Sequence, residues 1–207
     1  MKLRMRVSLP EPRAAALNLC LAVGLAVGVV GCGDRTTDVE YVQRAREHQA
    51  KRELQASVIE LKNALQKNPE NRDARALLGQ LYVETGNGVS AEKELQRAKE
   101  LGADRNVWLI PLARAYLLQG QNQKLLDLTP ETNDPADLQA TLLALHGLAE
   151  LALNRLDNAK ASLNRALELQ PDNSDALLGI SQLALVNRNY SEAENFANKA
   201  SERDPRD

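Results

Sequence analysis

The sequence predicts an all-α fold, a solenoid of about five stacked helical hairpins. Three observations carry this prediction. Leu and Ala dominate the 207 residues while aromatic residues make up only 3%, a composition that suits helices better than sheets. Long alternation of apolar and polar residues, which marks a half-buried strand, is absent. Pro69, Pro171 and Pro205 are separated by 102 and 34 residues, which are three periods and one period of the same length.

This period divides residues 38–207 into units of equal length. The units are 38–71, 72–105, 106–139, 140–173 and 174–207. Within a unit, apolar residues recur at spacings of three and four, as Leu61 and Leu65 do, which is typical of the buried face of a helix. Asn71 and Asn173 stand between units and are typical helix-capping residues. Each unit is therefore predicted to contain two antiparallel helices joined by a turn.

The first, second, fourth and fifth units share a pattern of small residues, which let two helices approach, and larger residues that fill the space between them. In the second unit this pattern comprises Leu78 and Gly79 on the first helix and Ala91, Leu95 and Ala98 on the second. The corresponding residues elsewhere are Ala45, Ser57, Leu61 and Ala64; Gly147, Ala159, Leu163 and Ala166; and Ser181, Ala193, Ala197 and Ala200.

The third unit departs from this pattern in its second helix. Pro130 and Pro135 leave room for that helix only over about residues 123–128. Pro111 also falls early in the first helix of the unit, where it is tolerated if the helix begins near residues 108–109. We expect a short or distorted second helix that loosens the stack at this point.

Residues 1–31 are predicted to be a targeting segment outside the fold. A basic start precedes an almost wholly apolar run over residues 14–30, and Val-Val-Gly then stands before Cys32. This ending resembles a bacterial lipobox, in which a Cys receives diacylglycerol on its thiol and the signal is cleaved off before it. The resemblance implies lipidation of Cys32 and a short tether over residues 32–37. The alternative is a plain transmembrane anchor with an incidental Cys.

The charge of the chain argues against a nucleic-acid partner. There are 26 Lys+Arg against 28 Asp+Glu, and without residues 1–31 there are 22 against 27. Such an acidic chain would be held at a membrane by its lipid rather than by a basic patch. In Gram-negative bacteria, Asp directly after the lipidated Cys tends to retain a lipoprotein in the inner membrane. Gly33 occupies that position here, so we expect the outer membrane, facing the periplasm, and Asp34 leaves the inner membrane open.

The hairpin pattern resembles the tetratricopeptide repeat (TPR). The resemblance implies a right-handed superhelix whose concave wall, formed by the first helix of each unit, binds a protein or peptide partner. By the register of the repeat, the candidate polar contacts in this groove are Arg46, Gln80, Arg114 and Gln182, within a lining that becomes more apolar toward the C-terminus. The alternative is that the Leu residues only pack and the Arg side chains are solvated or paired.

A narrower resemblance rests on the strings from Leu112 to Gly120 and from Leu145 to Ala149, together with the lipobox. These strings resemble TPR lipoproteins of the PEP-CTERM and exosortase systems. The resemblance implies a lipid-anchored scaffold that binds partner proteins in exopolysaccharide export or PEP-CTERM protein sorting. Two alternatives stay open: an envelope-assembly or secretion lipoprotein of the pilotin type, and a non-catalytic subunit of a glycan enzyme.

We expect no catalytic residues, no metal site and no cofactor. His48 and His146 fall on predicted first helices, where packing is the simplest role, and no carboxylate pair, phosphate-binding Gly-rich loop or Ser-His-Asp set is present. Soon after Pro205 the sequence stops without a further helix to cover the last hairpin. An uncovered hairpin exposes an apolar stripe, so we also expect self-association at this end.

Overall fold

The computed structural model describes residues 36–203, which form ten α-helices and no strand. In chain order these are α1 (Asp38–Ala50), α2 (Leu54–Lys67), α3 (Arg72–Glu84), α4 (Gly88–Glu100), α5 (Arg105–Leu118), α6 (Asn122–Leu126), α7 (Ala136–Ala152), α8 (Leu156–Leu169), α9 (Ser174–Val186) and α10 (Tyr190–Arg203). The predicted all-α fold is confirmed. The predicted signal, residues 1–31, and Cys32 lie outside the described residues.

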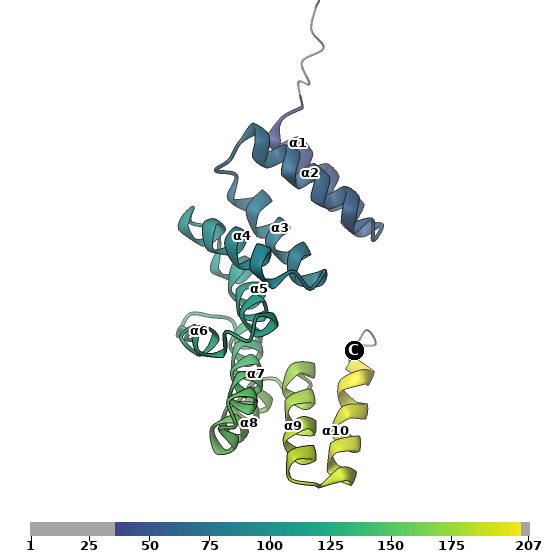
Figure 1. The fold of residues 1–207 in the computed structure, drawn as a ribbon, viewed down its shortest axis with the longest axis vertical. Helices are drawn as coiled ribbons and strands as arrows, with labels where there is room; N and C mark the ends of the chain where they lie inside the picture. The colour runs from purple at the N-terminus through teal and green to yellow at the C-terminus, as the bar shows by residue number, and fades with distance from the viewer. Residues whose placement is uncertain (1–35, 204–207) are drawn as a thin grey trace, which may run out of the picture. The chain divides into compact units, whose positions relative to one another are not determined.

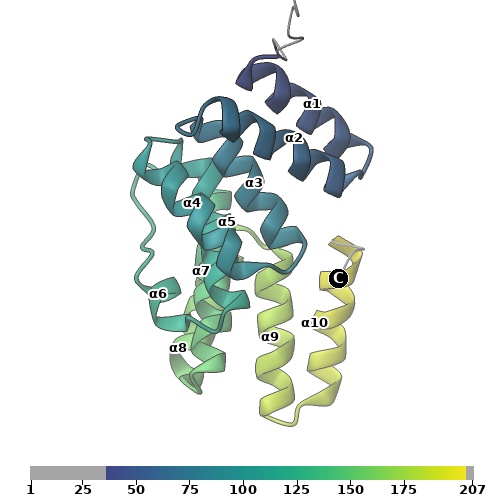
Figure 2. The same ribbon diagram turned by 45° about the horizontal axis from the view of Figure 1, so that its top comes forward.

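The helices pack as consecutive hairpins, each made of an odd-numbered first helix and an even-numbered second helix (Figure 1). The first helices α3, α5, α7 and α9 also contact one another in succession. The second helices α2, α4 and α8 each contact the first helix of the next hairpin. Figure 2 shows this arrangement clearly for the pair α9 and α10, which lie side by side beyond α7 and α8. The predicted stack of hairpins is therefore confirmed.

The turn inside each hairpin contains one residue with positive φ, and these residues recur every 34 positions. They are Arg52, Gly86, Gly120, Asn154 and Arg188, with φ between 57° and 74°. Left-handed backbone favours glycine because a Cβ crowds the neighbouring carbonyl oxygen. The two Arg residues therefore hold a costly conformation, which the packing of their hairpins compensates.

Glycine and leucine bring the two helices together in the second and fourth hairpins. A Cβ on Gly79 of α3 would overlap the side chain of Leu95 on α4, and one on Gly147 of α7 would overlap Leu163 on α8. Leu163 also fills the space beside Gly179 of α9, so one side chain joins two hairpins. Leu95 and Leu163 are fully buried. Close backbone approach thus allows one large side chain to fill each interface.

In the first and fifth hairpins, a buried serine lies where the two helices approach each other closely. Ser57 Oγ on α2 donates to the Ala45 carbonyl oxygen on α1 at 2.9 Å. In the fifth hairpin the direction is reversed, because Ser181 Oγ on α9 donates to the Ala193 carbonyl oxygen on α10 at 2.8 Å. Both hydroxyl groups are satisfied, so their burial does not leave a polar group without a partner.

Pro111 lies well inside α5, which begins at Arg105, so the expected helix start near residues 108–109 is wrong. The earlier start has a local cause. The Asp104 side chain caps the helix by accepting a hydrogen bond from Asn106 N at 2.9 Å. The proline therefore removes one hydrogen bond from the interior of a helix rather than an unneeded donor from its first turn.

The short second helix of the third hairpin does not interrupt the core. Helix α6 has five residues, and α7 begins directly after Pro135. One continuous cluster of buried residues runs from α4 through α5 and α6 to α7; it includes Leu95, Leu109, Leu112, Leu125, Leu142 and Leu145. The loosening that we expected is not seen, because Leu125 of α6 is fully buried within this cluster.

Arg105 fastens the segment between α6 and α7 to α5. Its guanidinium donates to Asp134 Oδ1 at 2.9 Å and to the Thr129 carbonyl oxygen at 2.6 Å, and it pairs with Glu131 Oε1 at 3.1 Å. Burial raises the pKa of Asp134, but the hydrogen bonds from Arg105 and from the Glu131 N–H outweigh it. The pKa of this carboxyl group therefore lies below its ordinary value. These polar contacts fasten the segment between α6 and α7 to α5, a role that a full-length second helix would otherwise fill.

Candidate functional site

The first helices α3, α5, α7 and α9 form a continuous layer, and one face of this layer is left uncovered by the second helices. We call the part of this face on α5, α7 and α9 the first-helix wall. Its large apolar residues are half-buried or exposed; they are Val107, Ile110, Leu117, Leu118, Leu148, Leu151, Leu178, Leu185 and Val186. The wall is the candidate partner-binding site, because a face of this kind is where helical solenoids bind.

The far ends of the first helices are apolar on α5, α7 and α9, whereas α3 ends in a charged residue. Pairs at corresponding positions are Val83-Glu84 on α3, Leu117-Leu118 on α5, Leu151-Ala152 on α7 and Leu185-Val186 on α9. Leu118, Leu185 and Val186 are 52%, 51% and 55% exposed. Because these residues recur in register, they line one edge of the wall. Gathered exposed apolar residues are typical of an interaction surface.

Arg114, a predicted groove contact, is already paired. Its Nη2 lies 2.7 Å from Asp175 Oδ2, so an ion pair joins α5 to α9 past the intervening first helix. The Asp175 side chain is mostly buried, while that of Arg114 is partly exposed. The pair adds no net charge to the wall and ties two hairpins that do not follow each other directly.

Gln80, another predicted contact, donates from Nε2 to the Val107 carbonyl oxygen at 2.9 Å. Val107 stands four residues before Pro111, which has no N–H to give to that carbonyl. The side chain of α3 thus replaces the hydrogen bond that proline removes from α5. This replacement is a physical reason why proline is tolerated in the interior of the helix.

Arg46 on α1 and Gln182 on α9 are exposed. The four predicted contacts come from four different helices, and no hydrogen bond within the described chain joins any two of them. Their roles toward a partner stay predictions. Asp175 and the exposed Leu118 and Val186 were not among the predicted groove contacts. The repeat register carries a signal for the two apolar residues, since both occupy the last position of a first helix.

The exposed face of α10, the second helix of the last hairpin, carries few large apolar residues. Ala197 and Ser201 stand where α8 has Leu163 and Leu167, and both are exposed. Among the large apolar residues of α10, only Tyr190 at its first position is strongly exposed. The α10 side of the last hairpin therefore exposes little apolar area, whereas Leu185 and Val186 on its α9 side are about half exposed, and self-association at this end stays a prediction.

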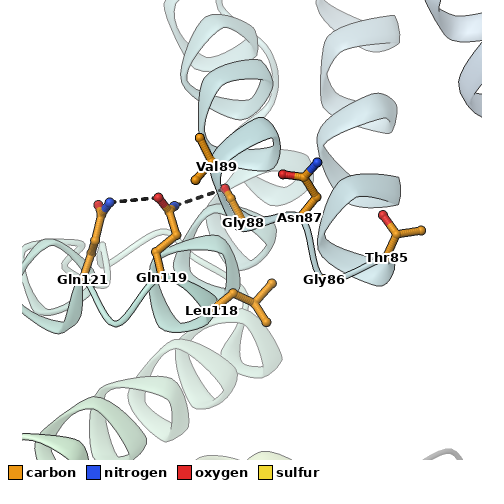
Figure 3. A pocket seen from close by; sticks show the side chains of 8 residues that line it. All are labelled: Thr85, Gly86, Asn87, Gly88, Val89, Leu118, Gln119 and Gln121. Carbon is orange, nitrogen blue, oxygen red and sulfur yellow. Dashed lines mark hydrogen bonds between the residues drawn. The ribbon is translucent and has the colours of Figure 1, made fainter.

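An open hollow of about 570 Å³ lies between the turns of the second and third hairpins (Figure 3). It is lined by Thr85, Gly86, Asn87, Gly88, Val89, Leu118, Gln119 and Gln121. Gln119 Nε2 donates to the Gly88 carbonyl oxygen at 3.1 Å, and Gln121 Nε2 donates to Gln119 Oε1 at 2.9 Å. These amides bind one another and the backbone, so they join the two turns.

Glu92 of α4 lies beside these amides. It accepts hydrogen bonds from Gln119 Nε2 at 2.9 Å and from Lys124 Nζ at 3.0 Å. Burial raises the pKa of Glu92, but the bonds from Gln119 and Lys124 outweigh it, so the pKa lies below its ordinary value. The carboxylate is therefore charged at neutral pH and connects α4 to α5 and α6.

The two histidines serve the fold. His146 Nε2 lies 2.8 Å from the Leu128 carbonyl oxygen, so the ring holds the segment after α6. Burial lowers the pKa of His146, against the opposing effect of the bond to Leu128. His48 Nδ1 lies 2.6 Å from Glu53 Oε2 beside the first turn. The position of the His146 ring agrees with the packing role that the sequence favoured, whereas His48 pairs with a carboxylate at a partly exposed position.

Within residues 36–203, no three His, Cys, Asp or Glu side chains are grouped so that they could hold a metal ion. Among the described helices, none has the length and apolar character needed to cross a membrane.

The tetratricopeptide repeat family model matches residues 50–110 and 150–207, which together make up more than half of the chain. The chain therefore belongs to the TPR family, whose repeats generally serve as non-catalytic scaffolds for protein–protein interaction. The unmatched stretch between the two matches contains α6 and most of α7, where the hairpin pattern is irregular.

Solved structures of other TPR proteins share the fold. PilF of Pseudomonas aeruginosa has a TM-score of 0.62 and 19% identity, over 80% of this chain and 76% of its own. A thermophilic TPR protein of Thermus thermophilus has a TM-score of 0.62 and 20% identity, over 83% and 93%. YrrB, described as having an unusual peptide-binding site, has a TM-score of 0.54 and 19% identity, over 81% of this chain and 87% of its own. No curated protein matches the sequence.

Proposed function

We propose that this protein is a lipid-anchored TPR scaffold that binds partner proteins through the first-helix wall. The observation that carries the proposal is the edge of exposed apolar residues, among them Leu118, Leu185 and Val186. A folded chain keeps such residues in water at a cost, which a bound partner removes. We place the scaffold in exopolysaccharide export or PEP-CTERM protein sorting, on the strength of the resemblance of its repeats and lipobox.

The anchor is proposed to be a lipid on Cys32, at the periplasmic face of the outer membrane. The Val-Val-Gly sequence before this residue supports lipidation, and Gly33 after it supports the outer rather than the inner membrane. The test compares the native protein with Cys32→Ser by intact mass and membrane fractionation. We expect an acylated native form in the outer membrane and an unacylated variant outside it. If both forms keep residues 1–31 in the inner membrane, the anchor proposal is wrong.

The scaffold proposal is tested by placing a photoreactive amino acid at Leu185 in cells and identifying the crosslinked proteins. Ile59 on α2 is the matched control, because it is 58% exposed against 51% for Leu185 but lies outside the wall. We expect specific partners at Leu185 only. Export or sorting proteins would support the proposed pathway, and secretion-channel proteins or a glycan enzyme would support the alternatives. Equal capture at both positions would contradict a binding role for the wall.

A further inference from the structure

We propose that Arg114 and Asp175 form a brace that sets the angle between the third and fourth hairpins, and thereby the shape of the first-helix wall. This inference rests on the proposed function, since it concerns how the same site is held ready for a partner. It gives Arg114 a positioning role, in place of the contact with a partner that its place in the repeat predicts.

The joints on either side of this angle are held by close contacts between successive hairpins. Between the second and third hairpins, α4 packs along α5, and Gln80 Nε2 donates to the Val107 carbonyl oxygen at 2.9 Å. Between the fourth and fifth hairpins, the side chain of Leu163 on α8 fills the space against Gly179 of α9. Joints that are packed in this way leave little freedom to change their angle.

The joint between the third and fourth hairpins has the shortest second helix. Helix α6 has five residues, whereas α4 and α8, which pack on the next first helix at the neighbouring joints, have 13 and 14. The core is continuous across this joint, but its second helix offers less than half of the usual length for contact with α7. Packing of the second helices therefore limits the angle less here than at the joints on either side.

The ion pair crosses this joint. Arg114 lies in the second half of α5 and Asp175 in the first turn of α9, and their side chains meet at 2.7 Å although both helices pack on α7. Helices that pack at about 8–10 Å place α5 and α9 about 16–20 Å apart in a flat layer. Bending the layer toward the wall shortens this distance, and flattening lengthens it. The pair therefore resists flattening where second-helix packing limits the angle least.

The exposure of the pair makes its strength depend on salt. The side chain of Arg114 is 42% exposed and that of Asp175 is 12% exposed. A partly exposed ion pair of this kind is modest in strength and is weakened by salt. A modest interaction is enough to shift the wall between shapes of similar free energy, which changes the affinity for a partner by a factor of a few.

The first experiment measures the shape of the wall in the full chain in phosphatidylcholine nanodiscs. Genetically encoded spin-label sites replace Leu118 and Val186, the exposed last residues of α5 and α9, and double electron–electron resonance gives the distance between them. Arg114→Met keeps an unbranched side chain and removes the charge, so we expect a longer and broader distance distribution. About 1 M salt should have the same effect on the native chain and little effect on the variant.

The second experiment measures binding of an uncharged probe, so that a direct charge contact with Arg114 does not contribute. The probe is a helical peptide of about 18 residues with one Leu/Ala face and one Gln face, long enough to cross several first helices. We expect Arg114→Met to weaken binding about fivefold and Arg114→Lys, which keeps the charge, to weaken it less. Arg165→Met, which breaks an exposed pair on α8, is the matched control and should leave binding and distance unchanged. Circular dichroism checks that the helices are intact.

If the distance is the same in the native chain, in Arg114→Met and at high salt, the pair is not a brace. If the distance changes but the peptide binds both forms equally, or binds neither, the shape of the wall does not set binding and the inference is overturned as well. In these cases the scaffold proposal stands, because it depends on capture of cellular partners at Leu185. Absence of specific capture at Leu185 would overturn the proposed function, whatever the distance shows.

Discussion

The second and fourth hairpins differ from the third in what holds their two helices together. In the regular hairpins, Gly79 faces Leu95 and Gly147 faces Leu163, so closely approaching backbones enclose one buried leucine. In the third hairpin the second helix has five residues, and Arg105 fastens the following segment through Asp134 and two further groups. The difference shows that a polar anchor can take over where too little helix remains to bury apolar area.

The polar anchor brings its own requirements. A buried carboxylate such as Asp134 needs its charge compensated, whereas a buried leucine needs only a well-filled space. The third hairpin therefore depends on a few specific hydrogen bonds and on the ionisation of one group. The stability of the regular hairpins depends instead on how completely a buried leucine fills the space between the two helices. These two kinds of dependence lead to different responses to mutation and pH, from which four predictions follow in order of expected effect.

Replacing the enclosed leucine should have the largest effect in a regular hairpin. Leu163→Ala removes a fully buried side chain that contacts Gly147 and Gly179, and should lower the free energy of unfolding by about 3 kcal/mol. Leu125→Ala in α6 should cost less, about 2 kcal/mol, because a five-residue helix can shift to fill the cavity. Urea unfolding at pH 7 measures both. A larger loss for Leu125→Ala would contradict the comparison.

Breaking the polar anchor should destabilise the third hairpin in a pH-dependent way. Arg105→Ala leaves the buried Asp134 carboxylate without its cation and should cost about 2 kcal/mol at pH 7. The pKa of Asp134 is lowered in the folded protein, so the stabilisation is complete above its ordinary pKa of about 4 and is lost as pH falls through the lower folded value.

The difference between native protein and Arg105→Ala should therefore shrink in acid, as measured by urea unfolding from pH 7 to pH 3. Arg165→Ala is the control, because Arg165 and Glu168 form an exposed pair on α8 worth at most about 0.5 kcal/mol. A cost for Arg105→Ala that stays constant over this pH range would show that the anchor does not depend on the Asp134 charge.

The hydrogen bond from Gln80 on α3 to the Val107 carbonyl oxygen on α5 should appear as a coupling energy in a double-mutant cycle. Gln80→Leu leaves the Val107 carbonyl oxygen without its partner and should cost about 1 kcal/mol. In a Pro111→Ala background the cost should nearly vanish, because that substitution restores a peptide N–H four residues after Val107. Thermal unfolding of the four proteins gives the coupling. Equal costs in both backgrounds would mean that Gln80 does not replace the missing bond.

The smallest effects should come from the turns, and they should be stabilising. Arg52→Gly and Arg188→Gly remove a Cβ from left-handed backbone and should each raise the free energy of unfolding by about 0.5 to 1 kcal/mol. Asn154→Gly should gain less, because Asn tolerates this conformation. Differences in melting temperature measure the series. A loss of stability in Arg188→Gly would show that its side chain supports the turn.

Much of the fold could be predicted because the decisive contacts repeat within one period. The prolines at 69, 171 and 205 indicate the length of 34 residues, and Gly79 with Leu95 indicates where helices meet. These features depend on short-range spacing and on the size of side chains. The apolar character of the candidate wall was also predictable, because its residues are set by position in the repeat.

Only the tertiary structure decided which of the predicted groove contacts already bind other residues of the chain. Arg114 pairs with Asp175, 61 residues away, and Gln80 reaches Val107, 27 residues away, across separate hairpins. Spacing along the chain does not predict such pairs, because they depend on the angle between hairpins, which results from the packing of many side chains together. The sequence therefore determined the repeat, its helices and its apolar face, and the stacking of the hairpins decided which polar groups on that face are already engaged.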